Sequence, residues 1–290
     1  MAVEEQKLTQ VRAYLEYFRD MGVYDFYRDS NAVAALTELE VPEVDTAVVM
    51  SAAPEPVRES THVLPDTSAS IFVLAEPAIA KPISFNDLAV LPTERIPAAD
   101  RAAALEAIRR DIGDCTRCPL AYGGRRTIVF GDGDPNARLM FVGEGPGADE
   151  DEQGLPFVGK SGQLLNNMIG AMGLRRDQVY VANIVKCRPP ANRAPEPVEA
   201  NTCTQFLVRQ MDIVQPEYVV ALGATAAMYL LGVRQSLVSL RGRFHPVRGA
   251  KALVTYHPAF LLRDPRQKGE AWKDLQMVMA EMGLKGKSGA

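Results

Sequence analysis

The stretch RLMFVG (138–143), followed after a glycine-rich loop by GKSGQLLNNMIGAMGL (159–174), decides the fold class of this chain. The first segment is a short apolar run that predicts a buried strand, and the second has apolar residues at helical spacing. Further strand and helix pairs follow at 178–186 with 196–214, 217–223 with 224–232, and 251–256 with 269–283. This alternation predicts a three-layer αβα fold of the α/β class, with a central, mostly parallel four-stranded sheet.

The sequence divides the chain into three parts. Residues 1–35 contain an amphipathic helix, because apolar residues recur at helical spacing within 5–28. Residues 36–100 are rich in Pro, Ala, Ser and Thr without sustained periodicity, which predicts a disordered linker. The folded domain is therefore expected at 101–290, and it begins with a predicted helix.

Charge is distributed unevenly between these parts. Residues 1–100 hold 17 acidic and 7 basic side chains, whereas residues 101–290 hold 19 acidic and 25 basic ones. A basic globular part suits a polyanion, but this excess is also compatible with an ordinary surface. No apolar run reaches the roughly 18 residues of a membrane span. The polar start MAVEEQKLTQ is not typical of a signal peptide, and we expect a cytoplasmic monomer without a membrane partner.

The unusual residues of the chain follow the predicted strands. GEGPGADED, KCRPPANR and HPAFLLR lie where three of these strands end. Parallel sheets bind ligands at the carboxyl ends of their strands, so we expect a site there. GEGPG is not the dinucleotide fingerprint, because Ala148 stands where the last glycine is needed. It is not a phosphate loop either, because no Lys-Ser/Thr pair follows.

The four cysteines are Cys115, Cys118, Cys187 and Cys203. A CxxC pair with two more cysteines in a cytoplasmic protein favours a metal site over disulfides. Both a tetrahedral zinc ion and a [4Fe–4S] cluster take four thiolates. The wide second spacing and Pro119 lean towards iron–sulfur, and unligated buried cysteines remain the alternative.

Three segments together carry a resemblance to a known family: GEGPGADEDEQGLPFVGKSGQLL (143–165), NIVKCRPPANRAPEP (183–197) and TYHPAFLLR (255–263). They resemble the motifs of the family 4 uracil-DNA glycosylases, the iron–sulfur type of bacteria and archaea. The resemblance implies a structural [4Fe–4S] cluster on the four cysteines. It also implies a nucleoid-associated enzyme that removes uracil from single- and double-stranded DNA and leaves an abasic site, which starts base excision repair.

The same resemblance assigns the residues that hold the extruded base. Asn183 would read the uracil edge, because its amide offers both a donor and an acceptor. Phe157 would stack on the pyrimidine. The turn formed by Gly145, Pro146 and Gly147 would bring backbone amides close to uracil O2 or a phosphate.

The catalytic groups implied by the resemblance are His257, Glu144 and Glu150. His257 would donate to uracil O2, where negative charge appears as the glycosidic bond breaks. Glu144 would position or activate the attacking water and stabilise the cationic sugar. Glu150 would share that work or shape the pocket against the methyl group of thymine.

DNA contacts outside the base pocket are expected from arginines and leucines of the same motifs. The arginines would bind phosphates, and an apolar side chain would fill the hole that the extruded base leaves. A surface position for the arginines and a core position for the leucines are the alternatives. The candidates are Arg188, Arg193, Leu261, Leu262 and Arg263.

Two other functions remain possible at this point. One is an iron–sulfur or zinc protein that binds nucleic acid without chemistry, and the weaker one is a phosphoesterase that uses the acidic cluster with a divalent metal. Covalent capture of uracil-DNA, as in a related branch, is not expected, because no histidine lies between Cys187 and Cys203. The N-terminal helix is expected to bind a protein partner.

Overall fold

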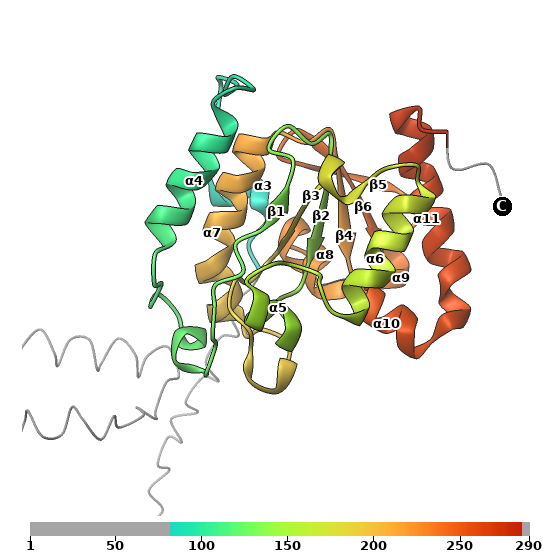
Figure 1. Cartoon of the computed structure of the whole chain (residues 1–290). Coiled ribbons are helices and arrows are strands. Elements are labelled where there is room, and N and C mark those ends of the chain that lie inside the picture. Colours follow the sequence, from blue (N-terminus) through green and yellow to red (C-terminus); the bar gives the residue numbers. More distant parts are fainter. Residues whose placement is uncertain (1–81, 286–290) are drawn as a thin grey trace, which may run out of the picture. The chain divides into compact units, whose positions relative to one another are not determined.

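The computed structural model describes residues 82–285, so the predicted N-terminal helix lies outside the described residues. The described part forms a six-stranded sheet in the order β1-β3-β2-β4-β6-β5 (Figure 1). The four central strands are parallel, and the two edge strands β1 and β5 are antiparallel to their neighbours. The strands are β1 (Asp132–Gly133), β2 (Leu139–Gly143), β3 (Tyr180–Asn183), β4 (Tyr218–Leu222), β5 (Phe244–Val247) and β6 (Ala250–Thr255).

Helices cover both faces of this sheet (Figure 1). The α-helices are α3 (Phe85–Leu88), α4 (Arg101–Ile112), α5 (Ala148–Gln153), α6 (Lys160–Ala171), α7 (Pro197–Val214), α8 (Ala224–Leu231), α9 (Leu237–Leu240), α10 (Pro258–Arg263) and α11 (Lys268–Met282). Short 3₁₀ turns lie at Pro119–Tyr122, Arg176–Gln178, Pro190–Asn192 and Pro265–Gln267.

Strand β2 shows how the two cores arise. All five of its residues are buried. Met140 and Val142 pack with α4, α7 and α8, whereas Leu139 and Phe141 pack with α6 and α11. Successive side chains of a strand point to opposite faces, so one apolar strand supplies both cores. The predicted three-layer αβα architecture with four parallel strands is confirmed.

Local sequence explains how the long helix α7 begins. Pro197 occupies its first turn, where a missing N–H costs nothing. The carboxylate of Glu199 accepts the backbone N–H of Glu196 at 2.7 Å, which closes a capping box. The helix ends at Gln215, which adopts a left-handed conformation.

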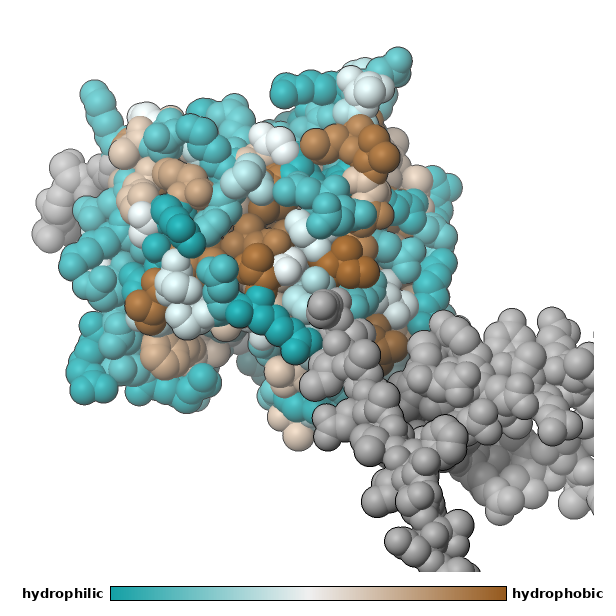
Figure 2. Space-filling model, turned by 180° about the vertical axis from the view of Figure 1, so that it is seen from behind, coloured by the Kyte–Doolittle hydropathy of each residue, from teal (hydrophilic) through white to brown (hydrophobic). Residues whose placement is uncertain are grey.

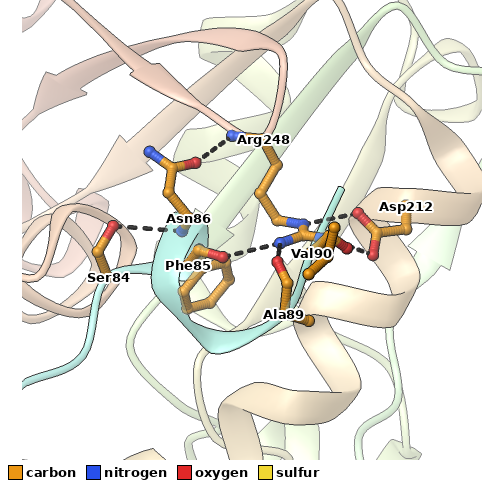
Figure 3. Close-up of polar contacts among 7 residues, drawn as sticks. All are labelled: Ser84, Phe85, Asn86, Ala89, Val90, Asp212 and Arg248. Atoms are coloured by element: carbon orange, nitrogen blue, oxygen red, sulfur yellow. Dashed lines mark hydrogen bonds and ion pairs between the residues drawn. The ribbon is translucent and has the colours of Figure 1, made fainter. Parts of the chain in front are cut away.

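Residues 82–100 differ from the disordered linker that the sequence predicts for 36–100. Ser84 caps helix α3, and the side chain of Phe85 is fully buried in the core beside α7 and α8. The guanidinium of Arg248 donates to the carbonyls of Phe85, Ala89 and Val90 (Figure 3). The compact domain therefore begins near residue 82, because tertiary contacts hold a segment whose composition is that of a linker.

Arg248 is itself fixed from a second side. It lies in the turn between β5 and β6 with a φ of 45°. Its guanidinium forms a bidentate ion pair with Asp212 of α7. Its backbone N–H donates to the side-chain oxygen of Asn86 at 2.7 Å (Figure 3). We call Arg248, Asp212 and the segment Ser84–Val90 the anchor.

The face of the domain that Figure 2 shows is mostly hydrophilic. Seen from behind, hydrophobic residues gather near the middle of the face, with hydrophilic residues around them (Figure 2). This agrees with a domain whose apolar side chains are largely collected in internal cores. Across residues 82–285, no helix has the length and apolarity that crossing a membrane would require.

Candidate active site

One pocket of about 470 Å³ opens at the carboxyl ends of the central strands. The register pairs Gly143 of β2 with Asn183 of β3, and Leu222 of β4 with Thr255 of β6. The loops that follow these strand ends line the pocket, as the fold rule for parallel sheets predicts. Its lining includes Glu144, Gly145, Pro146, Gly147, Glu150, Phe157, Asn183, Arg193, Thr225, His257 and Arg263.

Asn183 is the most buried polar side chain of the pocket wall. Its exposed fraction is 1%, and its Oδ1 has no hydrogen-bond partner among the described residues. A buried acceptor without a partner costs free energy and is rare in folded proteins. A ligand that donates a hydrogen bond to Oδ1 would remove that cost.

Phe157 packs against Asn183 across Gly143. A Cβ on Gly143 would lie 2.5 Å from the Asn183 Oδ1 atom and 2.6 Å from the Phe157 ring, so only glycine fits between them. Phe157 is buried and has a φ of 57°, which is costly for an aromatic residue. Its ring lies 5.5 Å from that of His257, tilted by 33°. The close contacts around Gly143 therefore constrain the position of the Phe157 ring in the pocket wall.

His257 caps helix α10, and this fixes its protonation pattern. Its Nδ1 accepts the backbone N–H of Ala259 at 3.1 Å. Burial, with a smaller contribution from the positive charge of Arg263, lowers the pKa of His257 from 6.5 to about 4. A neutral ring that accepts at Nδ1 carries its proton on Nε2. His257 can therefore act as a neutral donor through Nε2.

Glu144 follows β2 directly and also lines the pocket. Its Oε2 accepts a hydrogen bond from the hydroxyl of Thr225 at 2.5 Å. Thr225 lies in the first turn of α8, after the neighbouring strand β4. Thr225 was not predicted as a site residue, because ATAAMYLLG indicates only a helix.

Glu150, which we expected to share the chemistry or to shape the pocket, has its carboxylate bound by backbone amides. Its Oε1 accepts the backbone N–H groups of Val158 and Gly159 at 2.9 and 3.0 Å, and its Oε2 accepts that of Gly147 at 3.0 Å. Both oxygens are thus used to join the glycine turn to the loop that carries Phe157. Glu150 shapes the pocket by holding these two loops together, and its carboxylate is already engaged by amides.

Asp151, the next residue, is engaged in the same way. It is buried and accepts the backbone N–H groups of Arg126 and Thr127. The acidic cluster after the glycine turn is therefore used largely to order neighbouring loops.

The predicted DNA-contacting residues separate into two groups. Arg193 is paired with the buried carboxylate of Glu199 at 2.6 and 2.8 Å. Leu261 is only 1% exposed, so its expected DNA contact is corrected to a core position. Leu262, in contrast, is 44% exposed.

The two remaining arginine candidates are Arg263 and Arg188. Arg263 is exposed at the pocket rim, and Arg188 is half-buried with its Nε donating to the side chain of Asn192 at 2.7 Å. The helical turn of α10 therefore presents Leu262 and Arg263 outward while Leu261 faces the core.

The four cysteines come together at a second place. Cys115, Cys118, Cys187 and Cys203 all line one small cavity of about 10 Å³. Burial raises the pKa of Cys187 and of Cys203 to about 12. Within residues 82–285, no three His, Cys, Asp or Glu side chains are grouped so that they would hold a metal ion.

A backbone amide and two arginines lie near this sulfur-lined cavity, and such groups favour an anionic occupant. The backbone N–H of Lys186 donates to the Cys203 sulfur at 3.3 Å, and the Arg117 guanidinium lies 3.8 Å from the Cys115 sulfur. Arg125 is nearly buried, and its Nε has no partner among the described residues. The cavity therefore combines four thiols with nearby positive charge, a donor set whose chemistry is compatible with a cluster of net negative charge.

This chain is similar to known proteins over much of its described part. The model of the uracil DNA glycosylase superfamily matches residues 130–276. The type-4 uracil-DNA glycosylase of Thermotoga maritima is 43% identical over 168 residues, which cover 57% of this chain and 86% of the relative.

Two further relatives extend the comparison. The type-4 uracil-DNA glycosylase of Pyrobaculum aerophilum is 42% identical over 181 residues, covering 60% of this chain and 92% of the relative. The type-5 uracil-DNA glycosylase of Thermus thermophilus is 29% identical over 219 residues, covering 62% of this chain and 98% of the relative. Identity is thus higher to the type-4 relatives than to this type-5 one.

Proposed function

Because the chain belongs to the uracil DNA glycosylase superfamily, we propose that it is a monofunctional type-4 uracil-DNA glycosylase. It hydrolyses the N-glycosidic bond of uracil in single- and double-stranded DNA and leaves an abasic site, which starts base excision repair. One observation carries this proposal: the pocket sets the unpartnered acceptor of Asn183 among the same lining residues as His257 and Glu144.

Recognition of the base rests on Asn183. In an extruded uracil, N3–H is a donor and O4 an acceptor, so the Asn183 Oδ1 and Nδ2 atoms match them in the same order. The uracil N3–H would then supply the partner that Oδ1 lacks. The rings of Phe157 and His257, 5.5 Å apart, support stacking and donation from one wall of the pocket.

Bond cleavage moves the bonding electron pair from the sugar C1′ to the uracil ring. The Nε2–H of neutral His257 donates to uracil O2, where negative charge builds, and so acts mainly in the transition state. Glu144 orients a water molecule for attack at C1′ and stabilises the positive charge on the sugar. The hydroxyl of that water ends on C1′, and its proton is released.

DNA binding involves the rim of the pocket. Arg263 and Arg188 contact phosphates, and the exposed Leu262 enters the space from which the base departs. Arg193 contributes indirectly, because its guanidinium is shared with Glu199. The proposal includes a cytoplasmic, nucleoid-associated monomer.

A [4Fe–4S] cluster on Cys115, Cys118, Cys187 and Cys203 completes the proposal. The shared cavity and the cations around it support this assignment. When bound, the cluster would tie the Cys115–Cys118 loop to β3 and α7 without a redox step. Purified full-length protein should contain about four iron and four sulfide ions per chain, and Cys203→Ser should lower both. Zinc in place of iron would contradict the assignment.

The function itself is tested with an end-labelled oligonucleotide that contains one uracil. We expect strand cleavage only after alkali treatment, because the enzyme makes abasic sites without cutting the backbone. Binding without excision would instead indicate a nucleic-acid-binding protein. A complex that survives denaturation would indicate covalent capture, and either result would overturn the proposal.

A further inference from the structure

Thr225 faces the catalytic pocket from a helix that is otherwise apolar. Strands β2 and β4 are neighbours, and their register pairs Val142 with Ala221. Glu144 and Thr225 follow these strands and both line the pocket. The Thr225 hydroxyl donates to Oε2 of Glu144 at 2.5 Å, and this bond joins residues 81 positions apart in the chain.

Helix formation does not explain a threonine at this position. The N-cap of α8 is Gly223, with no side-chain hydrogen bond at the cap, and the neighbours of Thr225 are alanines. A β-branched residue is a poorer helix former than alanine. The hydroxyl makes its bond across the pocket instead of to its own helix.

We propose that Thr225 is the positioning residue of Glu144. Its hydroxyl occupies Oε2 and fixes the plane of the carboxylate, which leaves Oε1 to accept from the attacking water. Thr225 therefore acts through Glu144 and does not itself touch the base. This inference rests on the proposed function.

Four variants test the inference in single-turnover and steady-state excision assays: Thr225→Val, Thr225→Ser, Glu144→Gln, and Thr225→Val combined with Glu144→Gln. Valine keeps the shape and removes the donor, so we expect kcat to fall about 10- to 100-fold. The KM for uracil-containing DNA should change less than about twofold, because the bond orients water and not substrate. Serine restores the donor and should stay within about threefold of the wild type.

The double variant separates positioning from structure. If Thr225 acts only through Glu144, Thr225→Val should lower the rate of Glu144→Gln by less than about twofold, whereas independent effects would multiply. Thr127→Val is the matched control, because the Thr127 hydroxyl also makes a short bond, to the Asp151 carbonyl at 2.6 Å, outside the pocket. We expect its kcat to be unchanged.

The outcomes distinguish this inference from the proposed function. A folded wild type that excises no uracil refutes the proposed function. An active wild type with a fully active Thr225→Val refutes only the positioning role, as does a multiplicative loss in the double variant. Thermal unfolding of each variant shows that a loss of rate is not a loss of folded protein.

Discussion

The anchor and the catalytic pocket are both buried polar regions, but they differ in how their polar groups are satisfied. In the anchor, each guanidinium nitrogen of Arg248 donates to a carboxylate or carbonyl oxygen. In the pocket, Asn183 keeps a buried Oδ1 without a partner among the described residues, and His257 is held neutral by burial.

Because of this difference, we expect the anchor to contribute mainly to the stability of the fold and the pocket mainly to its function. A fully satisfied buried network stabilises one arrangement of the chain, whereas an unsatisfied one costs free energy until a ligand completes it. Removing a group from the anchor should therefore affect folding and spare chemistry. Removing a group from the pocket should lower the rate of the chemistry and leave folding largely unchanged.

The largest effect is expected from Asn183→Ala. Loss of the base-reading amide should lower kcat/KM for uracil excision about 10³-fold, since both hydrogen bonds to the uracil edge are removed. The melting temperature should hardly fall, because the variant also removes an unsatisfied buried oxygen. Alkali-revealed cleavage and thermal unfolding measure the two quantities. A large loss of stability with unchanged excision would reverse our assignment of this region.

Arg248→Met should show the opposite pattern. It leaves the Asp212 carboxylate without its partner and frees three carbonyls, so we expect a loss of about 3 kcal/mol in the free energy of unfolding. Excision per folded molecule should stay within about twofold. Denaturant titration measures the first and active-site-normalised rates the second.

Arg138→Met is the matched control for that variant. Arg138 and Glu217 form an ion pair with both side chains about half exposed. Its loss should cost less than about 1 kcal/mol, because exposed pairs are screened by water. Equal losses in the free energy of unfolding for the Arg138 and Arg248 variants would mean that burial adds nothing to the stabilisation by the anchor.

The pH dependence of stability gives a smaller effect. The pKa of His257 is about 4 in the folded protein against 6.5 in the unfolded chain, so the unfolded state binds the proton first as the pH falls. Stability should therefore decrease on acidification from about pH 7.5 to about pH 5.5, by about 1 kcal/mol from this residue. His257→Asn should remove this part of the slope. An NMR titration of the His257 ring with a midpoint near 6.5 would contradict the assignment.

The central strands and helices could be predicted because the sequence patterns that indicate them are local. Each parallel strand is an apolar run, and the helices between them show helical periodicity. Edge strand β5 was missed because FHPV contains a proline and alternates poorly, and β1 has only two residues. Helix α3 was missed because it depends on Arg248, far away in sequence, and long-range contacts override composition.

The grouping of the candidate residues was predictable where position along a strand decides it, whereas the roles expected of them came from the family resemblance. Asn183 and His257 follow strand ends, and parallel strands bring such positions to one edge of the sheet. The amide contacts of Glu150 were not predictable, because their three donors lie in loops whose proximity arises only in the folded protein. Leu261 and Leu262 are neighbours in sequence, and only the orientation of α10 decides which one is exposed.

The anchor also sets where anything attached upstream joins the domain. Gly232, which ends α8, comes so close to Ser84 that a Cβ there would lie 2.5 Å from its backbone nitrogen, whereas the first turn of α8 borders the pocket. Ser84 thus lies at one end of a helix roughly 12 Å long, and the candidate pocket lies at the other end. A truncation that removes the residues before 100 would delete the buried Phe85 side chain and leave an apolar cavity in the core.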